Sequence, residues 1–115
     1  MHELGIVFYI IRDVEDVFNE HDELTEVKSV TLELGQVSGV IPSYLEDVWK
    51  WAIQKHEVMK NAELKIEKMP AVTYCRNCGG KYDTVKYAKV CPYCQSEDTY
   101  LLTGNQINVK SIEAV

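Results

Sequence analysis

The stretch Cys75–Cys94, CRNCGGKYDTVKYAKVCPYC, decides how this chain of 115 residues is organised. It holds two C-x-x-C hooks with twelve residues between them. Two such hooks can deliver four thiolates to one tetrahedral ion. A glycine pair after the first hook and a proline inside the second favour tight turns. We therefore predict a closed structural zinc site whose ligands are Cys75, Cys78, Cys91 and Cys94.

Iron is the main alternative for the bound ion. The hooks also resemble those of rubredoxin-type electron carriers, so a rubredoxin-like redox module stays open. A catalytic zinc would keep an open coordination position and usually recruit a histidine, yet no histidine follows His56. The sequence also lacks a phosphate loop and a clear nucleophile–base pair, so we do not expect an enzyme.

The four cysteines are expected to be reduced. The apolar run from Leu4 to Ile11 has no basic residue before it and no small-residue cleavage site after it, which is unlike a signal peptide. The run is also too short to span a bilayer, so no membrane association is expected. We predict a cytoplasmic protein, in which metal binding is favoured over disulfides.

Charge is unevenly distributed along the chain. The net charge is −6; residues 1–70 carry 14 acidic and 7 basic side chains, whereas residues 75–94 carry 4 basic and 1 acidic. The acidic balance argues against nucleic acid, whose phosphates need clustered basic residues. A zinc-ribbon adaptor that binds nucleic acid nevertheless stays a second alternative, because the cysteine segment interleaves basic and aromatic residues. These are Arg76, Lys81, Lys86, Lys89, Tyr82, Tyr87 and Tyr93.

Outside the cysteine segment, apolar periodicity predicts two helices. The first covers residues 3–19, with a core stripe of Val7, Ile10, Ile11, Val14, Val17 and Phe18. After the turn-forming sequence GQVSGVIP, Ser43 and Glu46 form an S-x-x-E capping box that predicts the start of the second helix. The expected buried face of that helix consists of Leu45, Val48, Trp49, Ala52 and Ile53.

Alternating apolar residues predict about three strands. They centre on residues 30–34, 62–66 and 107–112, the last with a bulge near Ser111. Two helices on a roughly three-stranded sheet define an α+β fold class. We expect an α+β domain of residues 1–71 plus 100–115, interrupted by an inserted zinc-ribbon or rubredoxin-like domain of residues 72–99.

The amino terminus offers a second set of metal ligands. An α-amine on Met1, the backbone nitrogen of His2 and its imidazole can close adjoining chelate rings, and Glu3 can add an amide nitrogen or a carboxylate oxygen. Square-planar nitrogen sites favour Ni(II) or Cu(II) over zinc. Taken alone, the same residues also fit a solvated histidine and a glutamate that complements the dipole of the first helix.

Several segments in order along the chain resemble the HypA/HybF family of nickel metallochaperones for hydrogenase maturation. They are MHELGI at the start, LGQVSGVIPSYL (Leu34–Leu45), the two cysteine hooks, and GNQINVKSIE (Gly104–Glu113). The resemblance implies that residues 1–71 plus 100–115 form the nickel-binding domain. It also implies nickel ligation by the Met1 amine, His2 and Glu3, and zinc ligation by the four cysteines.

The resemblance also implies partners. These are an accessory GTPase that exchanges nickel and the large-subunit precursor of a [NiFe]-hydrogenase; some relatives also serve urease, so urease maturation proteins belong to the same expectation. A homodimer is compatible with the sequence. Two positions depart from the family pattern: Gly5 replaces a small hydroxyl residue, and Gln95 stands where glycine is common, so a left-handed backbone there would be strained.

Some residues are left without an assigned role. His21 and His56 lie near predicted helix ends, and Tyr44 and Trp51 lie away from the predicted buried face of the second helix. The acidic run Asp13–Glu26 holds seven carboxylates and no lysine or arginine. Such a run is usually a solvated face, but it can also steer a basic partner or concentrate cations.

Overall fold

The computed structural model describes residues 3–115, so the predicted nickel ligands Met1 and His2 lie outside the described residues. Contacts divide the chain into two compact units. The first contains the chain up to Glu33, Val40–Glu67 and Asn108–Val115; the second contains Leu34–Gly39 and Lys68–Ile107. Among residues 3–115, no helix is long and apolar enough to cross a membrane.

The first unit begins with helix α1, Glu3–Asn19. Its apolar residues recur at helical spacing, and Val7, Ile10, Ile11 and Val14 are buried as predicted. The end of the predicted core stripe is wrong, because Val17 is 44% exposed. The last buried residue of the helix is Val14, so the final turn of α1, up to Asn19, extends beyond the core.

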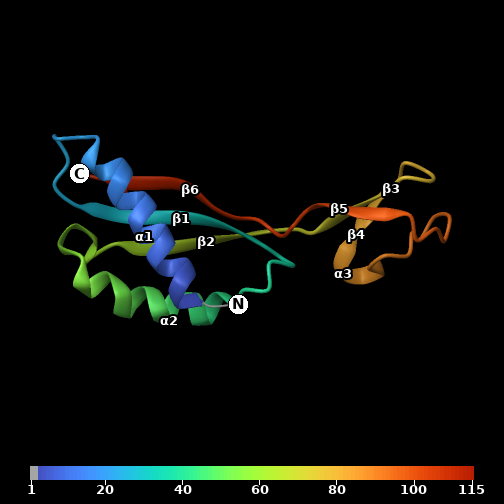
Figure 1. Cartoon of the computed structure of the whole chain (residues 1–115), viewed down its shortest axis with the longest axis horizontal. Coiled ribbons are helices and arrows are strands. Elements are labelled where there is room, and N and C mark those ends of the chain that lie inside the picture. Colours follow the sequence, from blue (N-terminus) through green and yellow to red (C-terminus); the bar gives the residue numbers. More distant parts are fainter. Residues whose placement is uncertain (1–2) are drawn as a thin grey trace. The chain divides into compact units, whose positions relative to one another are not determined.

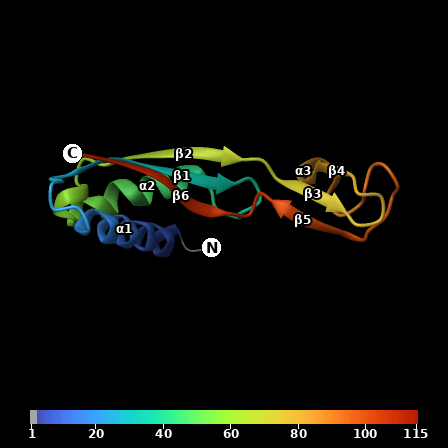
Figure 2. The same ribbon diagram turned by 90° about the horizontal axis from the view of Figure 1, so that it is seen from above.

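The sheet of the first unit consists of β1 (Val27–Gly35), β2 (Glu63–Met69) and β6 (Ile107–Ala114) in the order β2-β1-β6. The central strand β1 buries Val30, Leu32 and Leu34, the alternation that the sequence predicted. In β6, Lys110 and Ser111 are both exposed and interrupt the alternation where a bulge was expected. Figure 1 and Figure 2 show α1 and α2 on one side of this sheet.

Helix α2 covers Pro42–Ala52 and is followed by two short 3-10 turns, η1 (Ile53–Lys55) and η2 (Glu57–Met59). The predicted capping box is wrong: Ile41 is the N-cap, and no side chain caps the helix. Pro42 occupies the first helical turn, where its fixed φ starts the helix without a polar cap, so Ser43 lies inside it.

The buried face of α2 holds Leu45, Trp49 and Ala52, with Val48 only half-buried. The Trp49 indole Nε1 donates to the carbonyl of Ala62 at 2.9 Å. Because Trp49 is only 2% exposed, this bond satisfies the one polar atom of a large core side chain.

The second unit is built on a small antiparallel sheet of order β4-β3-β5, from β3 (Val72–Cys75), β4 (Lys81–Asp83) and β5 (Thr99–Thr103). A single helical turn, α3 (Thr84–Tyr87), follows β4. In the sheet, Thr73 pairs with Tyr82 on one side and Leu101 on the other, and Cys75 pairs with Thr99. The core is small: Cys75, Cys91 and Tyr82 are buried, and Cys94 packs against them.

Three backbone segments cross closely in the second unit at two glycines. The amide of Gly35 donates to the carbonyl of Gln106 at 2.7 Å, and the amide of Val37 donates to the carbonyl of Gly104 at 2.8 Å. A Cβ on Gly35 would lie 2.1 Å from the carbonyl oxygen of Gly104, and one on Gly104 would lie 2.4 Å from Cα of Ala71. Both positions therefore require glycine.

The predicted fold class is confirmed. The first unit places two helices on a three-stranded sheet, and the second gathers the four cysteines at one end of a separate small sheet.

Candidate metal centre

The two hooks have the same backbone geometry. In the first, the amide of Gly79 donates to the carbonyl of Cys75 at 2.8 Å and the amide of Cys75 donates to Gly80 at 2.9 Å. In the second, the amide of Gln95 donates to the carbonyl of Cys91 at 2.8 Å, and the amide of Cys91 donates to the carbonyl of Ser96 at 3.0 Å. Each hook is thus a closed turn that holds its two thiols on one side.

The shared geometry requires a left-handed residue directly after each hook. Gly79 has φ +74° and Gln95 has φ +60°. Glycine adopts this conformation freely, whereas glutamine pays a steric penalty for it. The left-handed backbone considered for Gln95 is present, and the hydrogen-bonded turn of the second hook accounts for it.

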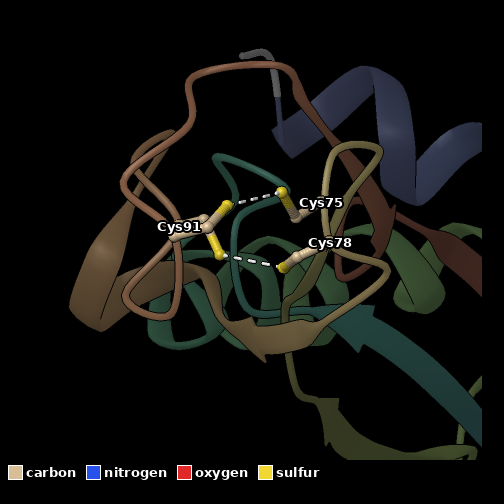
Figure 3. A group of neighbouring side chains, drawn as sticks. Cys75, Cys78 and Cys91 are labelled. Atoms are coloured by element: carbon tan, nitrogen blue, oxygen red, sulfur yellow. Dashed lines mark hydrogen bonds between the residues drawn. The ribbon is translucent and has the colours of Figure 1, made fainter.

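The four thiols converge on one point (Figure 3). All four Sγ atoms lie within 4.8 Å of one another. Across the hooks, Cys75 is 3.6 Å from Cys94 and Cys78 is 3.6 Å from Cys91. Cys75 and Cys91 are fully buried, Cys94 is half-buried and Cys78 is exposed.

The surroundings of Cys94 and Cys78 shift the pKa values of these two thiols in opposite directions. The side-chain amide of Asn77 lies 3.4 Å from Cys94 Sγ, and this donor and the backbone amide of Ser96 lower the pKa of Cys94 to about 6. The amide of Gly80 favours the Cys78 thiolate, but desolvation and the three other thiols outweigh it and raise the pKa of Cys78 to about 12. The Cys94 thiolate therefore forms readily, whereas the Cys78 thiolate needs a cation nearby.

This arrangement fits a tetrahedral dication. In a four-thiolate zinc site with Zn–S of about 2.3 Å, the sulfur atoms are about 3.8 Å apart, close to the two cross-hook distances. A dication would replace the repulsion between thiolates with attraction. Cys75, Cys78, Cys91 and Cys94 would hold it, and with four protein ligands it would supply structure rather than an open reaction site.

Some aromatic residues of the second unit make contacts within it. Tyr82 is buried, donates its hydroxyl to the carbonyl of Ala88 at 2.8 Å, and packs edge-on against Tyr87. The guanidinium of Arg76 lies 4.9 Å from the ring of Tyr100. Three of the basic and aromatic residues that favoured nucleic-acid binding, Arg76, Tyr82 and Tyr87, therefore already contact other residues of the second unit.

Glu3, the described member of the predicted nickel set, is the first residue of α1. It lines a surface groove together with Leu4 of α1 and three residues of α2, namely Tyr44, Asp47 and Val48. Two carboxylates, Glu3 and Asp47, therefore face one groove. Sequence reasoning did not single out Asp47, because its place beside Glu3 depends on how the two helices pack.

Asn77 was also missed. It lies inside the first hook, and its sequence position, between two predicted thiolate ligands, was the available signal. The two described histidines each lie beside a carboxylate: His56 Nδ1 is 3.1 Å from Glu15 and His21 Nδ1 is 3.4 Å from Glu23. Trp51 is 53% exposed and contacts Phe8 edge-on.

The fold and the four-thiol centre define a small α+β metal-binding protein with a separate cysteine lobe. A family model described as hydrogenase/urease nickel incorporation, metallochaperone, HypA matches residues 1–114. The chain belongs to the HypA family.

The sequences of individual relatives align with this chain over nearly their whole lengths. Hydrogenase maturation factor HypA of Geotalea daltonii is 33% identical and covered completely, as is this chain. Hydrogenase maturation factor HypA 1 of Bradyrhizobium diazoefficiens is 32% identical over 98% of each chain. The solution structure of the Ni metallochaperone HypA from Helicobacter pylori matches with a TM-score of 0.75 and 22% identity, over 100% of this chain and 98% of that one.

The family resemblance predicted from the sequence is thus confirmed. A family of maturation factors and metallochaperones favours a carrier over the redox module and the nucleic-acid adaptor.

Proposed function

We propose that this protein is a nickel metallochaperone that binds Ni(II) at its amino terminus and delivers it during maturation of a [NiFe]-hydrogenase. The observation that carries this proposal is the family match over residues 1–114, whose description names nickel incorporation. The protein acts in this role as a carrier and not as an enzyme, and the cytoplasm is its expected location.

The proposed nickel ligands are the Met1 amine, His2 and Glu3; the amine is a ligand only where the chain begins at Met1. An amine, two backbone nitrogens and an imidazole suit a square-planar Ni(II) ion. The groove shared by Glu3 and Asp47 supports the proposal, since two carboxylates raise the local concentration of cations. Amine and imidazole bind protons at about 7.7–8.0 and 6.5, so mild acidity would weaken binding and favour release.

The proposed occupant of the cysteine centre is Zn(II). Four thiolates in two matched hooks form a closed site, and a lobe with a core of three buried residues needs the ion to hold its fold. In this proposal residues 72–99 form the zinc-binding domain and residues 1–71 plus 100–115 form the nickel-binding domain.

The proposed partners follow from the same role. An accessory GTPase exchanges nickel with the carrier, and the large-subunit precursor of the hydrogenase receives it. Urease maturation proteins are a second group of recipients, consistent with the family description.

A nickel titration of tag-free protein that begins at Met1 tests the proposal. We expect one nickel per chain, and a loss of at least about a hundredfold in affinity in His2→Ala and in a variant with one residue added before Met1. Asp47→Asn should weaken binding about two- to fivefold, whereas Glu46→Gln, which removes the neighbouring charge outside this groove, should not.

The outcome against the proposal is equal nickel binding by the unaltered chain, His2→Ala and the extended variant. That result would move the nickel site away from the amino terminus. Zinc content is measured in the same samples and should stay at one per chain throughout, because none of these changes touches a cysteine.

A further inference from the structure

A groove runs between helix α1 and strand β6 in the first unit. It has a volume of about 590 Å³ and is lined by Asp13, Val14, Asp16 and Val17 of α1 and by Val109–Ile112 of β6. Figure 1 shows α1 crossing the sheet obliquely, so that only part of the helix, residues 13–17, lines the groove with β6. None of the predicted metal ligands within residues 3–115 lines this groove.

One wall of the groove is the open edge of a sheet. In the order β2-β1-β6, strand β6 pairs with β1 on one side, and no strand among residues 3–115 lies on its other side. An edge strand presents a row of outward-facing amides and carbonyls. These groups are matched by the backbone of an added extended segment, the mode of recognition called strand addition.

The floor of the groove is apolar and incompletely covered. Val14 is fully buried, and Val109 and Ile112 are half-buried. Val17 continues the apolar stripe of α1 at core spacing but is 44% exposed in the groove. An apolar side chain entering from outside would complete this part of the core.

The opposite wall is acidic. Asp13 and Asp16 lie one helical turn apart on α1, and neither forms an ion pair with any residue in 3–115. The one cation in the lining, Lys110, is already engaged: its Nζ lies 2.8 Å from Glu67 on β2. The wall therefore keeps two unpaired carboxylates, which belong to the acidic run Asp13–Glu26.

We propose that the groove between α1 and β6 is a docking site for an extended basic segment of a partner protein, which adds to β6 as a fourth strand. On the face of the added strand that is turned toward α1, an apolar side chain would contact Val17 and Ile112, and lysines or arginines two positions before and after it would pair with Asp13 and Asp16. A second copy of this chain is the less favourable occupant, because it would bring another acidic α1 toward the same wall. This site is independent of nickel binding.

The test uses the full zinc-loaded chain without nickel and a peptide of about six residues, Lys-Thr-Val-Thr-Lys-Thr, a usual strand length. Its lysines and its valine share one face. Binding is followed by fluorescence anisotropy of the peptide, and amide hydrogen exchange of residues 107–114 reports strand addition. Two control peptides carry glutamate in place of lysine, or a proline in place of the central valine, which removes a backbone donor.

A matched pair of variants separates the groove from general acidity. Asp13→Asn with Asp16→Asn should weaken peptide binding about three- to tenfold at physiological salt. Glu20→Gln with Asp22→Asn removes the same charge from the same run outside the groove and should change it less than about twofold. Val17→Ser should also weaken binding without altering the charge.

The expected result is binding of the lysine–valine peptide, weaker binding of both control peptides, and slower amide exchange in β6. The proposal is overturned if the glutamate peptide binds equally, if both charge variants lose affinity equally, or if β6 exchange is unaffected. It is also overturned if β6 protection rises with protein concentration in the absence of peptide, since a second copy would then occupy the edge.

Discussion

The Sγ atoms of Cys75 and Cys94 lie 3.6 Å apart, although 19 positions separate the two residues along the chain. Cys75 is the last residue of β3, and Cys94 ends the second hook. The turn of each hook and the pairing of β3 with β4 and β5 bring these sulfur atoms together. The thiol cluster and the fold of the cysteine lobe therefore depend on each other.

Replacing Cys75 should remove the ion and unfold the lobe. Cys75→Ser leaves three thiolates and places a hydroxyl in a fully buried position. We expect zinc affinity to fall by more than about a hundredfold, because removal of groups that merely support a ligand already costs up to that much. Zinc content and the dispersion of amide signals from residues 72–99 measure the effect.

The matched control is Val85→Ser, which alters an exposed residue of the same lobe. This variant should keep one zinc per chain and the dispersed spectrum. If Cys75→Ser also kept both, the proposed four-thiolate site would be wrong.

Asn77 should set the pH at which the ion is released. Its amide contributes most to lowering the pKa of Cys94 to about 6, so the thiolate form persists until the pH falls through that value. Loss of the donor raises the proton affinity of the sulfur, and acid then competes with the ion at higher pH. We expect half-release to move upward by about half a pH unit in Asn77→Ala.

Asn77→Asp makes the same test more severe, because it replaces the donor with a negative charge of similar shape. Its half-release should lie at still higher pH than that of Asn77→Ala. A chromogenic zinc indicator follows the release, and identical curves for all three proteins would contradict the role of Asn77.

The two tryptophans of α2 should differ sharply in their effect on stability. Trp49→Phe leaves the carbonyl of Ala62 without its donor and opens a cavity in the core. We expect the free energy of unfolding to fall by about 2–4 kcal/mol. Trp51→Phe changes a half-exposed ring on the same helix and should cost less than about 0.5 kcal/mol.

Urea unfolding of both variants, followed by circular dichroism, provides the comparison. Equal losses would show that the hydrogen bond of Trp49 and its burial do not determine the stability of the first unit.

Replacing either of two residues with glycine should make the lobe more stable. Gln95 has φ +60°, and Ala88 has φ +54° with ψ −124°, a combination that side chains rarely tolerate. Gln95→Gly and Ala88→Gly should each stabilise the lobe by about 0.5–1.5 kcal/mol, measured by resistance to thermal unfolding in zinc-loaded protein. Gly79→Ala, the reverse change at the matching position of the first hook, should destabilise it by a similar amount.

Much of the fold followed from periodicity. The stripes of α1 and the alternation of β1 were readable because each element buries one continuous face. The start of α2 was not, since the S-x-x-E pattern and the proline before it both signal a helix start and the proline prevailed. Val17 followed the stripe but lies where the core ends, which only the packing of α1 on the sheet determines.

Some residues of the candidate metal sites could be predicted from the sequence, and others could not. The spacing of the hooks identified all four thiols. A glutamine at position 95, where glycine is common, indicated that a left-handed backbone there would be strained. Asp47 and Asn77 escaped notice because their importance comes from what they lie beside. The nickel ligands Met1 and His2 fall outside the described residues, so that set stays a prediction.

The contact between Gly35 and Gly104 has a consequence for reading families of such sequences. A Cβ at either position collides with backbone, so a library of random substitutions selected only for folding would return glycine at both. In an alignment, these two columns would look as invariant as the four cysteines, although neither glycine offers a ligand to a metal. Invariance of Gly35 and Gly104 would result from steric exclusion of a side chain. Counting them as functional would overestimate the number of residues that take part in metal binding.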